Sequence, residues 1–192
     1  MICGVVMFKI IDQREIQKLG GRLSRYPYSY TLYCFVKKHF NIKDIVIWDC
    51  TFGHGRFYAC WLEKPKMLIA SDPYVHNWIV KPDIFIPETV WSAKRKIKKL
   101  NIKIDLLIVD PPFGGSEYHS REAYTYLIGS PNLIVEEAFK ASNELGIKHI
   151  ILHYNKIVEK ENFKIIDGFT FKAVCRFLNA TPQSHTILYE KI

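Results

Sequence analysis

The 192-residue sequence lacks the features that mark several common protein classes. Its cysteines number five, an odd count, and none forms a C-x-x-C pair, which argues against both a zinc site and a disulfide framework. We therefore expect free thiols and a cytoplasmic location. The apolar stretch from Met1 to Phe8 is too short to span a bilayer and lacks the charged start and cleavage site of a signal peptide. The sequence predicts neither export nor a membrane partner.

Acidic residues are scarce relative to basic ones. There are 19 Asp and Glu against 27 Lys and Arg, so the net charge is +8. This balance favours polyanionic partners, above all nucleic acid. The length fits one domain, and the chain has no repeat, low-complexity run or Gly/Ser linker. We expect a single domain over residues 1–192, with a basic, aromatic segment at 1–43 and a core at 44–192 that carries the candidate site.

Short apolar runs alternate with segments of helical pattern. Near-continuous apolar strands separated by helices indicate a mainly parallel sheet covered on both faces. This is an α/β doubly wound fold, which binds ligands at the carboxyl ends of its strands. The predicted strands are 44–48, 67–70, 84–86, 104–109, 149–153, 169–178 and 186–190, and the predicted helices are 57–62, 90–100 and 133–143, the last stopped by Gly146.

A glycine-containing turn follows the first predicted strand and runs from Asp49 to Gly55 (DCTFGHG). Glycines let a loop turn tightly and let a ligand approach the backbone. The phosphate-cradling pattern of nucleotide triphosphatases is absent, and the dinucleotide fingerprint is incomplete because Tyr58 stands at its third glycine. Asp72 follows the second strand, where an acid is placed to accept hydrogen bonds from ribose. The pair predicts a nucleoside-containing cofactor, with NAD and S-adenosylmethionine both open.

The segment Asp110-Pro111-Pro112-Phe113 follows the most apolar strand. Its prolines make the loop rigid and leave carbonyls free to accept hydrogen bonds. An amino group on a base is a poor nucleophile, because its lone pair is delocalised into the ring. Hydrogen bonds to the Asp110 carboxylate and the Pro111 carbonyl would localise that lone pair, and Asp110 could take up a proton. Phe113 offers a face for base stacking, worth about 1–3 kcal/mol. This chemistry requires no metal.

In this order the motifs resemble those of the class I S-adenosylmethionine-dependent methyltransferases, and among them the amino-methyltransferases with a (D/N/S)-P-P-(Y/F/W) motif. The segment from Asp49 to Gly55 is similar to the family's D-P-x-x-G-x-G cofactor loop, although Cys50 stands where proline is common. The resemblance covers residues 25–192. It implies a Rossmann-like sheet of seven mainly parallel strands with an antiparallel last strand, and S-adenosylmethionine as the cofactor.

The same resemblance assigns the candidate residues. The catalytic candidates are Asp110, Pro111, Pro112 and Phe113. The cofactor-binding candidates are Asp49, Thr51, Gly53, Gly55, Asp72, Pro73, Tyr26 and Pro27, the last two from a Tyr-Pro segment that often lines the family's cofactor pocket. The acid that binds adenine stays open between Asp83 and Glu88.

Three regions are candidates for holding the substrate. Residues 1–43 contain eight Lys and Arg interleaved with aromatic residues, which is the composition of a surface that contacts phosphates and stacks bases. For the aromatic residues at 33–40, packing of a helix on the sheet is an equally good explanation. A second basic run spans Lys94 to Lys103 and is more often a solvated helix face. The polar loop 114–132 is expected to order when substrate binds.

These features predict methylation of an exocyclic amino nitrogen of a nucleic-acid base, with adenine N6 favoured and DNA slightly ahead of RNA. A protein glutamine methyltransferase and a non-catalytic cofactor-binding or nucleic-acid-binding subunit are the alternatives. Because the chain has no room for a large target-recognition domain, a partner subunit or a homodimer stays open.

Overall fold

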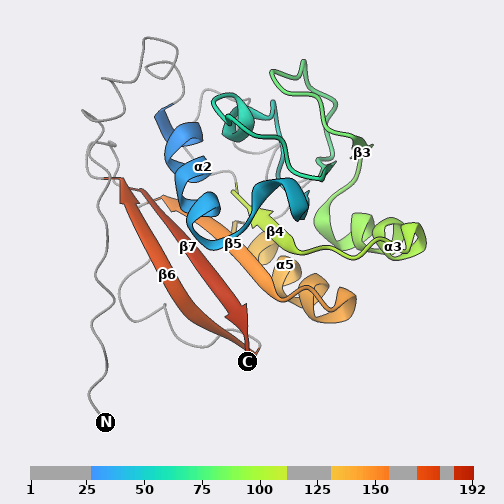
Figure 1. The fold of residues 1–192 in the computed structure, drawn as a ribbon. Helices are drawn as coiled ribbons and strands as arrows, with labels where there is room; N and C mark the ends of the chain where they lie inside the picture. Colours follow the sequence, from blue (N-terminus) through green and yellow to red (C-terminus); the bar gives the residue numbers. More distant parts are fainter. Residues whose placement is uncertain (1–26, 112–130, 156–167, 178–183) are drawn as a thin grey trace.

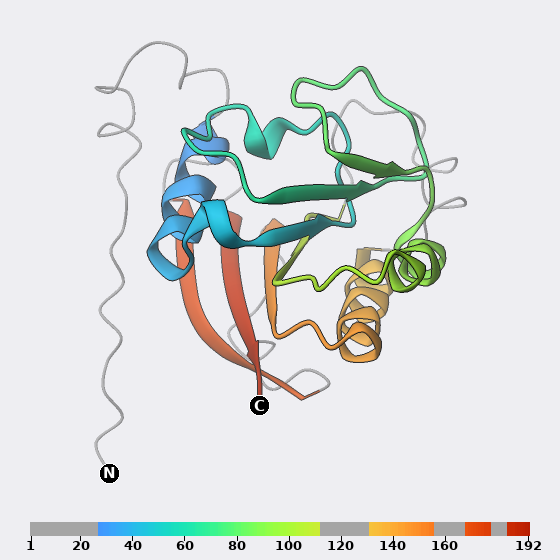
Figure 2. The same ribbon diagram turned by 45° about the vertical axis from the view of Figure 1, so that its right-hand side comes forward.

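The computed structural model describes residues 27–111, 131–155, 168–177 and 184–192. Its centre is a seven-stranded sheet in the order β3-β2-β1-β4-β5-β7-β6 (Figures 1 and 2). The strands are β1 (Val46–Asp49), β2 (Met67–Ser71), β3 (Ile84–Ile86), β4 (Leu106–Val109), β5 (His149–Asn155), β6 (Phe169–Phe177) and β7 (Ser184–Lys191). The first five run parallel, whereas β7 is antiparallel to both β5 and β6. The predicted fold class, including the antiparallel last strand, is confirmed.

Helices cover both faces of the sheet. On one face lie α3 (Val90–Leu100) and α5 (Pro131–Leu145), and on the other lies α2 (Pro27–His39) (Figure 2). Alternate residues of each strand therefore enter two separate cores, so Trp48 and Val109 pack toward α3 and α5 while Ile47 and Ile108 pack toward α2. Because both faces are buried, the strands are continuous apolar runs.

Helix α3 begins and ends where the sequence predicts. Its apolar positions Val90, Ala93 and Ile97 recur at helical spacing and are buried. Asn101 takes a left-handed conformation with φ of 52° and ends the helix. Similarly, Gly146, with φ of 68°, follows the end of α5 as expected.

The predicted helix at 57–62 is wrong, because only a short 3-10 turn, η3 (Arg56–Tyr58), forms there. The reason is a side chain from α2. Ser29 is buried, its hydroxyl donates to the Phe57 carbonyl at 2.8 Å, and its oxygen accepts the Cys60 N–H at 2.7 Å. In a continuing α-helix, the Phe57 carbonyl and the Cys60 N–H would form hydrogen bonds within the helix. Ser29 binds both groups instead.

The aromatic residues of α2 are explained mainly by packing. Tyr33 and Phe35 are buried against the sheet, together with Leu32 and Val36. The packing explanation for the predicted helix at 33–40 is therefore confirmed for these two residues. Residues 1–26, which hold most of the basic N-terminal segment, lie outside the described residues. Within the part that the structure describes, no helix is both long enough and apolar enough to cross a membrane.

Candidate functional site

Three carboxyl groups, those of Asp49, Asp72 and Asp110, meet at the carboxyl edge of the sheet. In the parallel register Asp49 pairs with Ala70 on one side and Ile108 on the other, so Asp72 and Asp110 each follow two residues later. Side chains alternate along a strand, and each acid lies two residues after a member of the core under α2. Those core residues are Ile47, Ala70 and Ile108. All three carboxyls therefore point to the face that α2 and η3 cover.

Thr51 joins the glycine turn to the catalytic candidate. Its N–H donates to Asp49 Oδ1 at 3.0 Å, and its Oγ1 accepts the backbone N–H of Asp110 at 2.6 Å. The hydroxyl also lies 3.5 Å from Asp49 Oδ1. The start of the Asp110 segment is thereby fixed to the turn that follows β1, although the two lie 59 residues apart in sequence.

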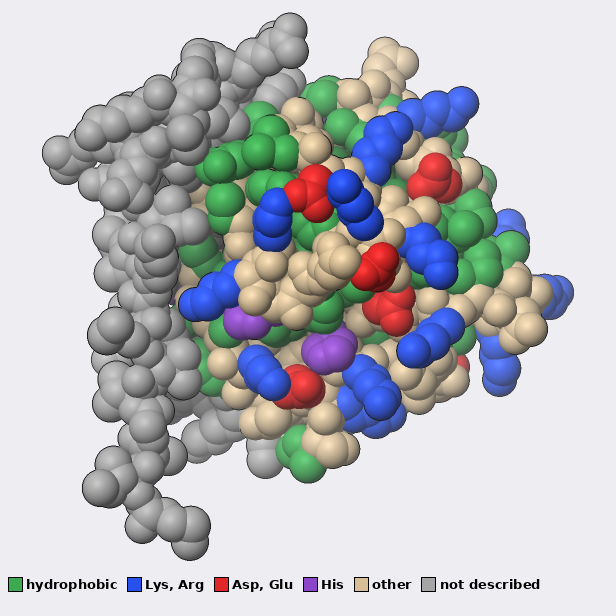
Figure 3. All heavy atoms as spheres, viewed as in Figure 1, with side chains coloured by type: hydrophobic (Ala, Val, Ile, Leu, Met, Phe, Trp, Pro, Cys, Tyr) green, Lys and Arg blue, Asp and Glu red, His purple; other side chains and the backbone are tan. Residues whose placement is uncertain are grey.

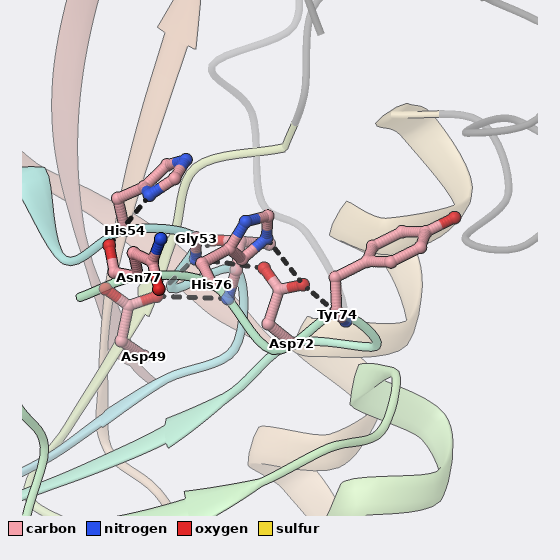
Figure 4. A network of polar contacts seen from close by, with 8 residues as sticks. Asp49, Gly53, His54, Asp72, Tyr74, His76 and Asn77 are labelled. Carbon is pink, nitrogen blue, oxygen red and sulfur yellow. Dashed lines mark hydrogen bonds and ion pairs between the residues drawn. The ribbon is translucent and has the colours of Figure 1, made fainter. Parts of the chain in front are cut away.

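Asp72 closes the glycine turn from the neighbouring strand (Figure 4). One carboxylate oxygen accepts the Gly53 N–H at 2.9 Å, and the other accepts the Tyr74 N–H at 2.9 Å. His76 Nε2 lies 3.5 Å from the Asp72 oxygen that accepts the Tyr74 N–H. Each carboxylate oxygen has a second lone pair, so Asp72 can hold the loop and still accept a ligand hydroxyl.

Burial and mutual proximity perturb the acids. Loss of solvation raises the pKa of Asp49 to about 7; hydrogen bonds from Thr51 and Tyr58 oppose this rise, and the nearby Asp72 charge adds to it. The Tyr58 hydroxyl donates to Asp49 Oδ2 at 2.9 Å. Burial, followed by the Asp49 charge, also raises the pKa of Asp110 well above its ordinary value. Negative charge is therefore disfavoured on Asp49 and on Asp110.

The ion pairs of the described lysines lie away from this crowding. Among the residues that the structure describes, the ion pairs found for lysine side chains are with other acids, and His76 approaches Asp72 at 3.5 Å. In the same part of the chain, no group of three or more His, Cys, Asp or Glu is arranged to hold a metal ion. The site is therefore suited to a ligand that carries positive charge itself.

The two glycines of the turn differ in the space around them. Gly55, with φ of 72°, packs so closely that a Cβ would meet Phe52 Cζ at 2.7 Å and the Val80 carbonyl oxygen at 2.9 Å. Gly53, with φ of 54°, has nothing within 4 Å of that position. Gly55 is thus fixed by packing, whereas Gly53 leaves open space beside an N–H that Asp72 holds.

Replacing Gly55 with alanine should destabilise the protein by about 2–4 kcal/mol. The energetic cost of a left-handed backbone at a non-glycine residue adds to the cost of the two close contacts. Gly53→Ala is the matched control and should cost only about 1–2 kcal/mol, since the backbone cost alone applies. Urea unfolding of both variants measures the difference. Equal losses in the two variants would contradict the packing role of Gly55.

A segment after β2 packs on the turn. His54 Nδ1 lies 3.0 Å from the Asn77 carbonyl oxygen, and the Ile79 N–H donates to the His54 carbonyl at 2.9 Å. The rings of His54 and His76 lie 4.6 Å apart between centroids (Figure 4). Residues 72–80 therefore form a second wall of the site, which His54 contacts from the turn.

The remaining candidates fall into three groups. Pro111 is buried directly after Asp110, and Pro73 is half-buried directly after Asp72. Pro27 begins α2, and its side chain is not among those described. Pro112, Phe113 and Tyr26, like most of the loop 114–132, lie outside the described residues.

The two candidates for the adenine-binding acid lie at opposite edges of the sheet, and each has a partner. Asp83 accepts the Leu68 N–H at 2.8 Å, near the start of β2 and so at the amino edge of the sheet. Glu88 pairs with Lys96 at 2.7 Å. Both acids have structural partners, which explains their presence without a ligand.

The second basic run also lies away from the site. Helix α3 leads into β4, so Lys98 and Lys99 at its end lie toward the amino edge, opposite the three acids. Lys94 pairs with Glu144 at 2.6 Å, and acidic side chains lie among the scattered Lys and Arg on the face in Figure 3. This run is best explained as a solvated helix face.

Two residues at the site, Tyr58 and His153, were not predicted from the sequence. Tyr58 was noted only as a missing glycine, yet it holds Asp49 and is itself buried. His153 was noted only as part of an apolar strand, yet it lies on β5 directly after the last residue that pairs with β4. A polar residue at the carboxyl end of an otherwise apolar strand is the signal that marks His153.

No protein-family model matches the chain, and no curated protein matches it. Solved structures share its fold. Magnesium protoporphyrin IX methyltransferase from Synechocystis PCC 6803, with bound S-adenosylmethionine, gives a TM-score of 0.57 at 11% identity, over 96% of this chain and 86% of that one. An rRNA methylase from Streptococcus thermophilus gives 0.54 at 12% identity, over 86% and 96%. TrmK from M. capricolum, in complex with S-adenosyl-homocysteine, gives 0.55 at 15% identity, over 83% and 67%. The chain therefore has the Rossmann-like fold that these methyltransferases share.

Proposed function

We propose that this protein is an S-adenosylmethionine-dependent methyltransferase that methylates an exocyclic amino nitrogen of a nucleic-acid base. The observation that carries the proposal is the Thr51 hydroxyl, which accepts the Asp110 N–H at 2.6 Å while the Thr51 N–H binds Asp49. The turn that would hold the cofactor and the residue that would hold the acceptor are thereby joined in one structure.

Charge selects S-adenosylmethionine over a dinucleotide. A dinucleotide would bring two phosphate charges to the edge where the raised pKa values of Asp49 and Asp110 already show that negative charge is disfavoured. S-adenosylmethionine carries a sulfonium and an ammonium group, which oppose the carboxylates. The methyltransferase structures with bound S-adenosylmethionine and S-adenosyl-homocysteine support the same choice, because they share this fold.

The residues present fit this cofactor. Gly53 leaves open space on the turn, and Asp72 keeps lone pairs for ribose hydroxyls while it holds the Gly53 N–H. Asp49 would supply a buried carboxyl for the positive groups of the cofactor. When bound, the cofactor supplies a methyl group on a sulfonium, which is already a strong electrophile, so the protein mainly positions the partners.

Asp110 performs the acceptor chemistry. Its ionised carboxylate accepts a hydrogen bond from the acceptor NH2, and this bond directs the nitrogen lone pair away from the ring and toward the methyl group. Its backbone N–H is held by Thr51, which fixes the main chain from which the carboxylate projects. A nearby positive charge favours the ionised form of the carboxyl group, which burial alone disfavours. As the nitrogen gains positive charge, Asp110 is placed to receive its proton.

The acceptor polymer is a nucleic acid. The +8 net charge supports a polyanionic partner. An amino group conjugated to a ring is also the acceptor that needs a carboxylate to localise its lone pair. DNA and RNA both present such amino groups, and the rRNA methylase of the same fold moves our preference from DNA to RNA. Adenine N6 stays the first choice of position.

Transfer of a tritiated methyl group to separate RNA, DNA and protein pools tests the proposal. We expect label in a nucleic-acid pool and, by preference, in RNA. Label confined to the protein pool would instead identify a protein methyltransferase, such as one acting on glutamine. Binding of S-adenosylmethionine with no label in any pool would identify a non-catalytic subunit. Either outcome contradicts the proposal.

A further inference from the structure

His153 lies beside Asp110 at the carboxyl edge of the sheet. In the parallel register of β4 and β5, Val109 pairs with Leu152, so Asp110 and His153 are the next residues on the two chains. Ile108 and Ile151, two residues earlier, both belong to the core under α2, so the two polar side chains share that face. Neighbouring strands lie about 4.8 Å apart. An acceptor held by Asp110 is therefore within reach of His153.

Thr186, Phe57 and Tyr28 contact the histidine ring. Its Nδ1 lies 2.9 Å from the Thr186 hydroxyl on β7. The rings of Phe57, in η3, and Tyr28, in the first turn of α2, meet it edge to face at 5.2 Å and 5.9 Å between centroids. Elements from both ends of the chain therefore fix its orientation, which is the requirement for a residue that positions a ligand.

The ring is also uncharged. Burial, with a smaller contribution from His185, lowers the pKa of His153 to about 4. A protonated histidine at this position would pair with the Asp110 carboxylate and take it from the acceptor amino group. A neutral imidazole leaves that carboxylate available; one of its ring nitrogens donates and the other accepts, and Nδ1 lies at the Thr186 hydroxyl.

We propose that His153 is a positioning residue on the acceptor side of the site, and that it aligns the ring of an amino-bearing base while Asp110 holds the amino group. The inference rests on the proposed function and deepens it. In adenine, cytosine and guanine the amino group stands next to a ring nitrogen, so two adjacent polar side chains match two adjacent polar atoms. Such a pair therefore matches the amino edge of a flat amino-heterocycle.

The test compares His153→Phe, which keeps a flat ring, with His153→Asn, which keeps hydrogen bonding. His149→Phe is the matched control, because His149 begins the same strand at the opposite edge and packs on Phe40. Methyl transfer to random-sequence single-stranded RNA and DNA oligonucleotides is measured at several oligonucleotide concentrations. The affinity for S-adenosylmethionine is measured separately by calorimetry.

We expect His153→Phe to lower kcat/KM for the oligonucleotide by about tenfold, mainly through KM, as the loss of one hydrogen bond implies. Its affinity for S-adenosylmethionine should stay within about twofold, His153→Asn should recover part of the loss, and His149→Phe should match the wild type. Wild-type kinetics in His153→Phe would overturn this inference alone. Parallel loss of cofactor binding in both His153 variants would show a purely structural role and overturn it too. A wild-type protein that labels neither oligonucleotide would refute the proposed function, and the inference with it.

Discussion

Replacing Asp110 with alanine is expected to lower methyl transfer by about 10³-fold, the range of a lost general base, and to leave the affinity for S-adenosylmethionine within about threefold. The reason is that different residues of the proposed site serve the cofactor and the acceptor. In the proposed site, Asp49, Gly53 and Asp72 at the carboxyl ends of β1 and β2 would hold the cofactor, whereas Asp110 follows β4 and would face the acceptor. Its backbone N–H, which Thr51 holds, survives the change to alanine.

Initial rates with tritiated S-adenosylmethionine and calorimetric cofactor affinities measure the two quantities separately. Asp105→Ala is the matched control, because Asp105 precedes the same strand at the opposite edge, where its carboxylate accepts the Val46 N–H at 2.9 Å. This control should lose about 1 kcal/mol of stability and keep its activity. Retained transfer in Asp110→Ala would refute the role given to the carboxylate, whatever the cofactor affinity.

The Asp49→Asn variant should gain stability over the wild type as the pH rises, in the absence of cofactor. The pKa of Asp49 is raised from its ordinary value of 3.8 to about 7 in the fold, mainly by burial. Between these values the folded protein keeps a proton that the unfolded chain has lost. The stability contribution of Asp49 is therefore fully present below its unfolded pKa and is lost as the pH rises through its folded pKa.

Asparagine has no such proton, so the stability difference between the variant and the wild type should grow by about 2–3 kcal/mol from pH 5 to pH 8. Urea unfolding at the two pH values measures it. The same variant should bind S-adenosylmethionine more weakly at pH 8, because the carboxylate that opposes the positive groups is gone. A stability difference that is equal at both pH values would show that Asp49 ionises normally in the fold.

Much of the site was predictable because it follows from strand ends. Asp49, Asp72 and Asp110 each follow an apolar run, and parallel strands bring their carboxyl ends to one edge. The sheet and α3 were predictable for a similar reason, since periodic apolar residues define both. These inferences need only local pattern and the parallel topology.

What the sequence could not supply depends on contacts between distant residues. Ser29 turns a predicted helix at 57–62 into the short η3 turn, and it does so from 28 and 31 positions away. Asp72 closes the glycine turn from another strand, and Thr51 meets Asp110 across 59 residues. The adjacency of Asp110 and His153 requires the register of β4 and β5, which a local pattern does not fix.

The most direct test of the central claim is the identity of the methylated nucleoside. RNA and DNA are incubated separately with the protein and S-adenosylmethionine, digested to nucleosides and analysed by mass, with Asp110→Ala treated in parallel. The account predicts one nucleoside that carries a methyl group on its exocyclic amino nitrogen, N6-methyladenosine first, formed by the wild type and absent with the variant. A methyl group on a ring carbon, a ring nitrogen or a ribose oxygen, or the same product from Asp110→Ala, would contradict it.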